Sequence, residues 1–269
     1  MKTIVYLSSS IIPEVASELT SKLKQNNISV RLIKEPNNMW VRDYLPAVNK
    51  DGNLVRYIYR PDYLLESERY KKMIVDANGF AEKEFYKTHI NLDVVLDGGN
   101  IVQLGDDYVA MTEKAMAENP KLSREELEHR ISDAFHCKVL WLPWDKKEIY
   151  GHADGMVNWC DGKVIMTNYS DFDPSIAKEI HRRLNKAGFD VVELKYKFRH
   201  GFHSRSWCYV NFLQTDNVIF LPKLGVDEDE EAKEQISAVT SKRIETVNVL
   251  PLVRRGGALH CATWEYIEK

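Results

Sequence analysis

The 269-residue sequence lacks the features that mark several large classes of protein. It has only four cysteines, with no CxxC pair and no regular spacing, so we expect reduced thiols in a cytoplasmic protein and no disulfide framework. Nowhere do roughly 18 apolar residues run together, which argues against a membrane-spanning helix. The 37 Lys and Arg nearly balance the 40 Asp and Glu, and without a basic excess nucleic acid is a poor candidate for a partner.

Two further absences concern the organisation of the chain. No Pro/Ser-rich linker divides it, and no G-x-G-x-x-G follows a strand-like segment, which disfavours a two-domain Rossmann-like chain. The first residues, MKTIVYLSSSIIPEVASEL, start basic but interrupt a short apolar run with serines and then turn acidic. We interpret them as a strand and a helix, and not as a signal peptide. A single domain over residues 1–269 is therefore predicted.

What the sequence does contain is a set of unusual motifs at nearly equal intervals. They are MWVRDYLP with Asp43, LDGGN with Gly98, GHADG with His152, CYVNF with Asn211 and RRGGALHC with Cys261. The intervals between these five residues are 55, 54, 59 and 50, each about one fifth of the chain. Self-similarity at such a period predicts an architecture of repeated units.

The segments between the motifs follow one pattern. After each of the first four motifs come two apolar runs around a turn such as Asp161-Gly162, then a helix-like stretch, then a short β run. The stretch LSREELEHRISDAF has Ser123 as its cap and Glu126 three residues later, and PSIAKEIHRRLNKAGF ends at Gly188, a typical stop signal. Each unit therefore has the pattern ββαβ.

The two ends of the chain together make up one further unit. The sequence ends soon after Cys261, without a helix, whereas the N-terminus supplies the strand KTIVYL, the helix PEVASELTSKLKQNN and the strand SVRLI. We therefore predict an α/β fold, a five-fold pseudosymmetric propeller of ββαβ units, in which the motifs converge on one pocket.

Each motif residue has an ordinary structural explanation when it is taken alone. Cys261 lies in an apolar run and could be a buried structural cysteine. His152 could be a hydrogen-bonded loop histidine, and Asp43 could form a surface ion pair with Arg42. The H-x-D pair could bind a metal, but no third His or EF-type loop accompanies it, so no metal is expected. Asn211 lies in an apolar run and needs partners if it is buried.

One chemistry uses these residues together. A thiolate at Cys261 needs a base or a cationic neighbour, and we expect His260 to face away because successive residues of a strand point to opposite faces. His152 and Asp154, two apart on an extended segment, are expected to share a side. Several carboxylates in one pocket need a cationic substrate, and two acids around a planar cation with many donors reverse the usual Arg–carboxylate pair. The inferred substrate is a guanidinium.

The ordered motifs W-x-R-D…P, (E/D)-G-G-N, G-H-x-D, Y-x-N and G-G-x-x-H-C resemble those of the agmatine deiminase / bacterial peptidylarginine deiminase family, in the guanidino-group-modifying superfamily. The resemblance runs from Trp40 to Cys261. It implies a pentein-like α/β propeller and a cofactor-free hydrolase that converts a guanidino group to a ureido group with release of ammonia. With agmatine, the product would be N-carbamoylputrescine, in putrescine biosynthesis. The implied partner is a small guanidino substrate, and a homo-oligomer is conceivable.

The resemblance also implies a role for each matching residue. Cys261 matches the nucleophile that forms a covalent amidino intermediate, and His152 matches the general acid/base. Asp154 and Asp43 match the carboxylates that hold the guanidinium nitrogens, and Asn211 matches an asparagine counted among the catalytic residues. The substrate-binding residues expected beside them are Trp40, Asp97, Gly98, Gly99, Asn100 and Arg255.

Two departures from the family pattern bear on the substrate. Asp97 stands where the family usually has Glu, so its carboxylate reaches one methylene less. Arg254 and Arg255 precede the nucleophile in a segment that we expect to be extended, in which one of the two would point inward. An inward guanidinium would repel the terminal ammonium of agmatine and could pair with an α-carboxylate instead. Surface ion pairs for both arginines are the other interpretation.

Other activities stay open on the sequence. The substrate could be free arginine or peptidyl-arginine, and an amidinotransferase would pass the same intermediate to an amine. A non-catalytic guanidine- or polyamine-binding protein could retain the same pocket. A cysteine protease is disfavoured because its nucleophile normally opens a helix, and GGALHCATW does not have the pattern of one.

Overall fold

A computed structural model describes residues 2–34, 38–85, 89–197 and 203–268. Its described strands form five sheets of three strands each. In every sheet the middle strand pairs with one neighbour in antiparallel and with the other in parallel orientation, and a helical segment connects the parallel pair. The ββαβ pattern predicted for each repeat is confirmed.

Contacts between residues divide the chain into two units. The larger unit consists of Met1–Arg42 and Asp154–Lys269, and the smaller unit is Asp43–Ala153. The single domain expected from the sequence stays a prediction. Both boundaries fall inside motifs, between Arg42 and Asp43 and between Ala153 and Asp154, so the predicted site residues are distributed over both units.

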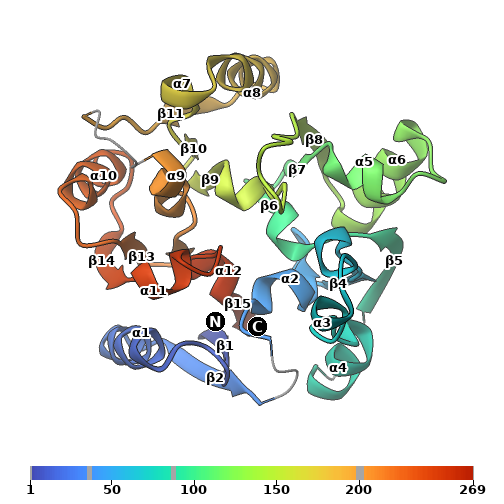
Figure 1. Ribbon diagram of the computed structural model, residues 1–269, viewed down its shortest axis with the longest axis horizontal. Helices are drawn as coiled ribbons and strands as arrows, with labels where there is room; N and C mark the ends of the chain where they lie inside the picture. Colours follow the sequence, from blue (N-terminus) through green and yellow to red (C-terminus); the bar gives the residue numbers. More distant parts are fainter. Residues whose placement is uncertain (1, 35–37, 86–88, 198–202, 269) are drawn as a thin grey trace. The chain divides into compact units, whose positions relative to one another are not determined.

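The larger unit contains three of the sheets. In the first, β1 (Lys2–Ser8) lies between the parallel strand β2 (Ser29–Ile33) and the antiparallel strand β15 (Thr263–Glu268). The two ends of the described chain therefore lie side by side (Figure 1), which confirms that the N-terminal strands complete the last repeat. The other two sheets are β9 (Val157–Cys160), β10 (Lys163–Met166) and β11 (Asp190–Glu193), and β12 (Leu213–Gln214), β13 (Val218–Lys223) and β14 (Arg243–Asn248).

The smaller unit contains the remaining two sheets, which have the same connections. One consists of β3 (Ala47–Val48), β4 (Leu54–Ile58) and β5 (His89–Val95), and the other of β6 (Val102–Leu104), β7 (Tyr108–Thr112) and β8 (Lys138–Leu142). In both, a motif follows the last strand along the chain: Asp97 comes two residues after β5, and His152 comes after β8 and the intervening residues 143–151.

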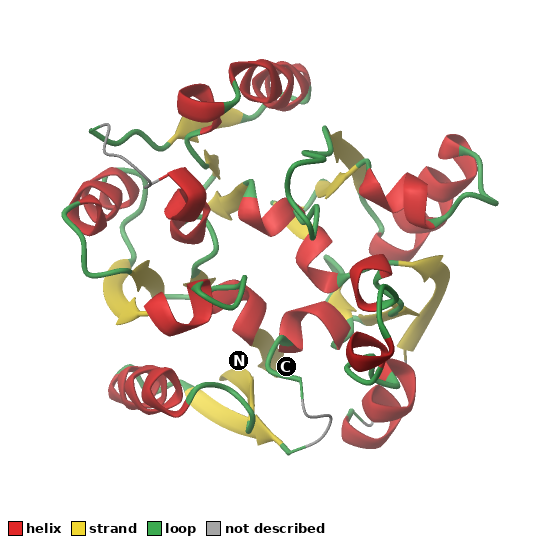
Figure 2. Cartoon of the chain, in the orientation of Figure 1, coloured by secondary structure: helices red, strands yellow, loops and turns green. Residues whose placement is uncertain are grey.

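Along the chain, helices follow the middle strand of each sheet. Figure 2 shows these helices in red and the strands in yellow. In the larger unit they are α1 (Pro13–Gln25), α7 (Tyr169–Phe172), α8 (Pro174–Lys186) and α10 (Glu228–Ser237), and in the smaller unit α3 (Glu68–Lys71), α4 (Ala77–Glu84), α5 (Lys114–Glu118) and α6 (Arg124–Phe135). Four more single-turn helices are α2 (Val41–Tyr44), α9 (His203–Ser206), α11 (Leu250–Val253) and α12 (Leu259–Ala262). Among the helices of the described residues, none has both the length and the apolar character needed to cross a membrane.

Local sequence determines where the longer helices and the turns lie. The Ser123 side chain accepts a hydrogen bond from the backbone N–H of Glu126 (3.1 Å), so α6 begins at the predicted cap. After α8 the chain turns at Gly188 with φ of 90°, as its stop signal predicts. Asp161 and Gly162 both have positive φ, 44° and 89°, which is the geometry of a two-residue hairpin turn between β9 and β10.

The core of the larger unit supports the strands that lead to the motifs. Helix α1 buries Val15, Leu19 and Leu23, which lie on one face because they are four residues apart. Strand β13 is buried from Val218 to Pro222, as expected for the middle strand of a covered sheet. Each fully buried aliphatic side chain contributes about 1.5–3 kcal/mol of transfer free energy, so these elements form a rigid base for the loops at the strand ends.

Candidate active site

Cys261 lies in the short helix α12, directly before β15. The extended backbone expected from GGALHCATW is therefore wrong, and with it the argument that a protease-like nucleophile helix is missing. The N–H of His260 donates to the backbone oxygen of Asn211 (3.0 Å), which ties the first turn of α12 to a distant segment. A four-residue helix has no stability of its own, because nucleation is unfavourable, so such a tertiary bond is needed to form it.

Asn211 connects the thiol to two backbone groups. Its side chain is completely buried, and its Nδ2 donates to Cys261 Sγ and to the backbone oxygen of Asp154, both at 3.2 Å. Its Oδ1 accepts from the backbone N–H of Cys261, also at 3.2 Å. The partners that a buried asparagine requires are thus present. The amide fixes the position of the sulfur relative to the helix that carries it.

Asp154 brings a carboxylate to the same thiol. Its Oδ2 lies 3.6 Å from Cys261 Sγ and 2.7 Å from His260 Nδ1. The backbone of Ala153–Gly155 forms a 3-10 turn, so the extended segment predicted for GHADG is wrong. The prediction that His260 faces away is also wrong, because α12 is helical and successive residues there are about 100° apart. His260 is the residue that the sequence argument missed, and its position next to the cysteine was the only signal.

Trp40 rests against the glycines that precede the nucleophile. A Cβ atom on Gly257 would lie 2.2 Å from Cζ3 of the Trp40 ring, so this position has to be glycine. Arg42 makes two further contacts from the same segment. Its Nε donates to the backbone oxygen of His260 (3.3 Å), and its guanidinium pairs with Glu265. The ion pair of Arg42 is thus with Glu265 and not with its neighbour Asp43. Both contacts hold the Trp40 segment to α12 and β15.

In the smaller unit, His152 lies between two carboxylates. Its Nε2 is 3.0 Å from Asp97 Oδ2, and its Nδ1 is 3.9 Å from Asp43 Oδ1. The shorter side chain of Asp97, compared with the usual Glu, still reaches the imidazole. Asp97 is 1% exposed, and its Oδ1 has no hydrogen-bond partner among the residues that the structure describes. Buried carboxylates need a compensating positive charge, so this cluster favours a cation.

The DGGN motif holds the histidine in place. Gly98–Asn100 form a 3-10 turn, and a Cβ on Gly99 would lie 2.4 Å from His152 Nδ1 and 2.9 Å from Asp43 Oδ1. Only glycine allows the imidazole and the carboxylate to pack there. Asn100 Oδ1 accepts from the N–H groups of Ala153 (3.2 Å) and of Thr112 (2.9 Å). These contacts position His152, whereas direct binding of substrate by this motif stays a prediction.

Arg254 and Arg255 lie at the end of helix α11 and not in an extended strand, so the predicted alternation of their side chains is wrong. The N–H of Arg255 donates to the oxygen of Leu252 (2.8 Å), which continues the helical turn. Both side chains are exposed, and neither forms an ion pair with any residue of the described ranges. A role for Arg255 in substrate binding stays a prediction.

The other cysteines lie in settings that disfavour thiolate formation. All four cysteines are free. Burial raises the pKa of Cys137 to about 11, and it raises the pKa values of Cys160 and Cys208 above the usual range. Because the thiolate is the reactive form, these three side chains are suited to packing and not to nucleophilic attack.

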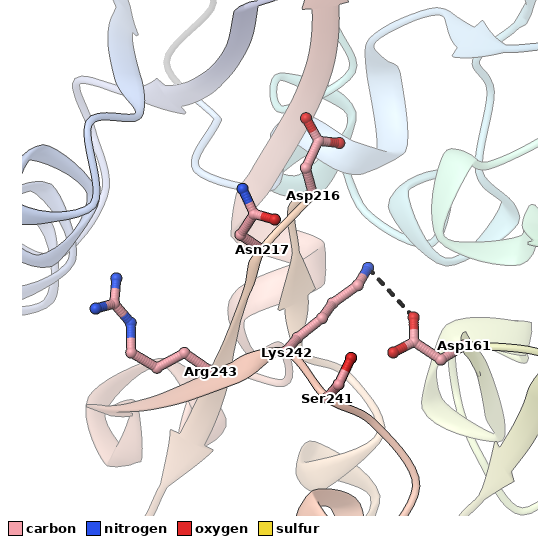
Figure 3. A pocket seen from close by; sticks show the side chains of 6 residues that line it. All are labelled: Asp161, Asp216, Asn217, Ser241, Lys242 and Arg243. Carbon is pink, nitrogen blue, oxygen red and sulfur yellow. Dashed lines mark ion pairs between the residues drawn. The ribbon is translucent and has the colours of Figure 1, made fainter.

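The larger unit also contains a polar hollow of about 660 Å³, shown in Figure 3. It is lined by Asp161, Asp216, Asn217, Ser241, Lys242 and Arg243. The Lys242 ammonium lies 3.6 Å from the Asp161 carboxylate and donates to the Thr215 oxygen (3.1 Å), so its charge is already compensated. None of the predicted site residues lines this hollow, and we assign it no part in the chemistry.

Known proteins share both the sequence pattern and the fold. A protein of Enterococcus faecalis assigned as an agmatine deiminase is 26% identical over 84% of this chain and 74% of its own length, and one of Mycoplasma capricolum is 27% identical over 87% and 76%. The solved agmatine deiminase of C. jejuni has a TM-score of 0.74 at 17% identity, covering 99% of this chain and 93% of that one. The one of Enterococcus faecalis has a TM-score of 0.72 at 22% identity, covering 98% and 92%.

These structural matches confirm the predicted fold class. The family model described as Porphyromonas-type peptidyl-arginine deiminase matches residues 3–266, which is almost the whole chain. The match confirms the resemblance inferred from the five motifs and the expected class of protein, a hydrolase that acts on guanidino groups. The chain therefore belongs to the family of Porphyromonas-type peptidyl-arginine deiminases.

Proposed function

We propose that this protein hydrolyses the guanidino group of agmatine, or of a related arginine derivative, to a ureido group through a covalent intermediate on Cys261. The observation that carries the proposal is the setting of the thiol, whose sulfur lies 3.2 Å from the Asn211 amide nitrogen and 3.6 Å from the Asp154 carboxylate. A carboxylate beside a nucleophilic sulfur can hold a planar cation in front of it by paired N–H···O bonds. The names of the relatives point to the same substrate class.

The carboxylates also explain how the thiol could be activated. A free thiol has a pKa of about 8.5 and is mostly protonated at neutral pH, and an adjacent carboxylate disfavours its ionisation further. A bound guanidinium would neutralise the charge of Asp154 and add a positive charge near the sulfur. The thiolate would thus form mainly when substrate is present, which protects the empty enzyme from alkylation and oxidation.

The proposed reaction has two steps. Cys261 sulfur attacks the central guanidinium carbon while Asp43 and Asp154 keep the group oriented and charged. His152 donates a proton to the leaving nitrogen, ammonia departs, and an S-linked amidino intermediate with the substrate's tail remains. His152 then takes a proton from water, water adds to the same carbon, the C–S bond breaks, and the ureido product leaves. General acid–base help of this kind is worth about 10²–10⁴-fold.

This mechanism requires the Cys261 cluster and the His152 cluster to act on one guanidinium. The assay is incubation of the purified protein with agmatine, free arginine and a blocked peptidyl-arginine, with ammonia and ureido product measured separately. We expect both products in equal amounts from at least one substrate. Ureido product that forms without an added amine distinguishes hydrolysis from amidino transfer, and a protein that only binds guanidines releases no ammonia.

Variants identify the nucleophile. Cys261→Ser should abolish turnover and retain the fold, whereas Cys137→Ala, with the thiol of raised pKa, should keep the wild-type rate. Acid quenching during turnover should trap on Cys261 an adduct with the mass of substrate minus ammonia. A Cys261→Ser protein with wild-type turnover would disprove the covalent mechanism.

The choice between agmatine and arginine is proposed to depend on Arg255. An exposed guanidinium near the nucleophile's own segment would favour a substrate with an α-carboxylate over one with a terminal ammonium. Arg255→Ala should then lower kcat/KM for arginine relative to agmatine, and each tenfold change corresponds to about 1.4 kcal/mol. An unchanged ratio would assign tail recognition to other residues. The four free thiols support a cytoplasmic location as part of this proposal, and a homo-oligomer stays a prediction.

A further inference from the structure

A buried lysine of the smaller unit is not used by the proposed reaction. The side chain of Lys114, the first residue of α5, is only 1% exposed. Its Nζ lies 2.8 Å from Asp62 Oδ1 and 3.2 Å from Glu118 Oε1, and it donates to the backbone oxygen of Tyr150 (2.8 Å). Lysine is almost never fully buried unless it is paired, because removal of its charge from water is costly. The contacts of the Lys114 ammonium therefore have to offset the free energy that its burial costs.

The acceptor of that bond belongs to the segment that carries His152. One residue further on, the backbone oxygen of Gly151 accepts a hydrogen bond from Thr112 Oγ1 (2.6 Å), and Thr112 is also completely buried. Two successive carbonyl groups before His152 are therefore bound by side chains from the junction of β7 and α5. On the other side of His152, the N–H of Ala153 donates to Asn100.

Glycine at position 151 is a condition of this arrangement. Its φ is +63°, a conformation that other residues rarely adopt. A Cβ there would also lie 2.7 Å from Cδ of Lys114 and 2.8 Å from Nε1 of Trp144. The lysine stem therefore packs directly on the backbone that precedes His152.

The lysine also lies close to the two aromatic residues that contact His152. Its Nζ lies 5.0 Å from the centre of the Tyr63 ring, next to the carboxylate partner Asp62. The Tyr63 ring contacts His152 edge-on, with 6.2 Å between ring centres, and Tyr150 lies 5.9 Å from the same imidazole. The groups around the imidazole include Asp97, Asp43 and these two rings, and the lysine binds the segments of both rings.

We propose that Thr112 and Lys114 form a backbone clamp, two side chains that bind the carbonyl groups of Gly151 and Tyr150 and so position the His152 imidazole between Asp97 and Asp43. They are positioning residues and touch no substrate. The proposal rests on the proposed function only in that His152 is the acid/base, and a misplacement of about 1 Å at such a group can cost on the order of 10²-fold in rate.

The most specific test is the pair Thr112→Val and Thr112→Ser. Valine retains the shape and loses the hydroxyl that binds Gly151, whereas serine retains the hydroxyl. We expect Thr112→Val to lower kcat by about 10–100-fold with little change in KM and to shift the pH profile of kcat, and Thr112→Ser to stay close to the wild type. Lys114→Met should act in the same direction, and the effects of Lys114→Met and Thr112→Val should not be additive because both act through one segment.

A stability control separates positioning from loss of folded protein. Ile131→Val, in the buried face of α6, should lower the midpoint of thermal unfolding and leave kcat unchanged. Lys121→Met, an exposed lysine of the same unit, should change neither.

Imidazole NMR titration of His152 gives a readout that does not depend on turnover. If the wild type releases no ammonia from any guanidine, the proposed function fails, and the clamp is still tested by this titration. We expect Thr112→Val to change the titration midpoint or the line width of the His152 signal and Thr112→Ser to leave both unchanged. A Thr112→Val protein with the kcat and the His152 titration of Thr112→Ser would overturn the proposal.

Discussion

Replacement of Asn211 by aspartate tests whether the amide controls the state of the nucleophile. The change is nearly isosteric, but it replaces the Nδ2 donor, 3.2 Å from Cys261 Sγ, by an oxygen that carries a negative charge. At that distance two unit charges repel by about 1 kcal/mol at the dielectric constant of water and by about 5 kcal/mol at an effective value of 20. Since about 1.4 kcal/mol corresponds to one pKa unit, the pKa of the Cys261 thiol should rise by about one unit or more.

The assay is the pH dependence of alkylation by iodoacetamide. It is run in a Cys137→Ala background, because Cys137 is the one of the four cysteines that is not buried, and the Cys261 peptide is quantified by mass spectrometry. We expect the midpoint of the rate profile to move to higher pH in Asn211→Asp, together with loss of turnover.

A matched control accounts for the cost of a buried aspartate as such. Asn49 of the smaller unit is also buried and also donates to a backbone oxygen, that of Ala134 (3.1 Å). Asn49→Asp should lower stability without moving the alkylation profile. If the midpoint of alkylation is the same in Asn211→Asp as in the Cys137→Ala parent, the amide does not control the thiol and our account of the site is wrong.

Two further predictions concern the smaller unit. Gly99→Ala should lower kcat at least tenfold and destabilise the protein by about 1–3 kcal/mol, because its Cβ would displace His152 and Asp43. The control Gly155→Ala, whose Cβ has no atom within 4 Å, should fold normally. Thermal unfolding and ammonia release are measured for both variants. Burial, followed by the charge of Asp97, raises the pKa of Glu118 to about 7. Because this pKa is higher in the folded than in the unfolded protein, the stability from Glu118 is complete below about pH 4.5 and is lost as the pH rises through 7. Glu118→Gln should flatten the fall of the free energy of unfolding between these values in urea titrations, and an unchanged slope would refute the assignment.

Local rules account for most of what the sequence predicted correctly. The cap at Ser123, the stop at Gly188 and the turn at Asp161-Gly162 depend on the backbone preferences of a few adjacent residues, so they can be recognised without any tertiary information. The repeat was visible for a related reason. Five units that bury equivalent faces need equivalent patterns, and the motifs at their strand ends therefore recur at one fifth of the chain.

The errors have one physical cause. A single-turn helix such as α12, or the turn at the end of α11 with Arg255, is too short to leave a periodic pattern. In α12 the backbone also depends on contacts with remote segments. The partner of His260 is Asp154, which is 106 positions away, and the bond that holds the start of α12 comes from Asn211.

The sequence by itself thus determined the ββαβ pattern of the five repeats and the family of the chain, and it supplied the reactive side chains as a prediction. Only the tertiary structure decided which atoms of these side chains meet and why their neighbours are constrained. Gly99 was expected only as a substrate-binding residue, and the structure shows that it has to be glycine because His152 and Asp43 pack against its Cα. None of the five sequence motifs includes Lys114, and in the structure it is buried with two carboxylates and a carbonyl group around its ammonium. Pairings of this kind depend on distances between segments far apart in the chain, which no local pattern encodes.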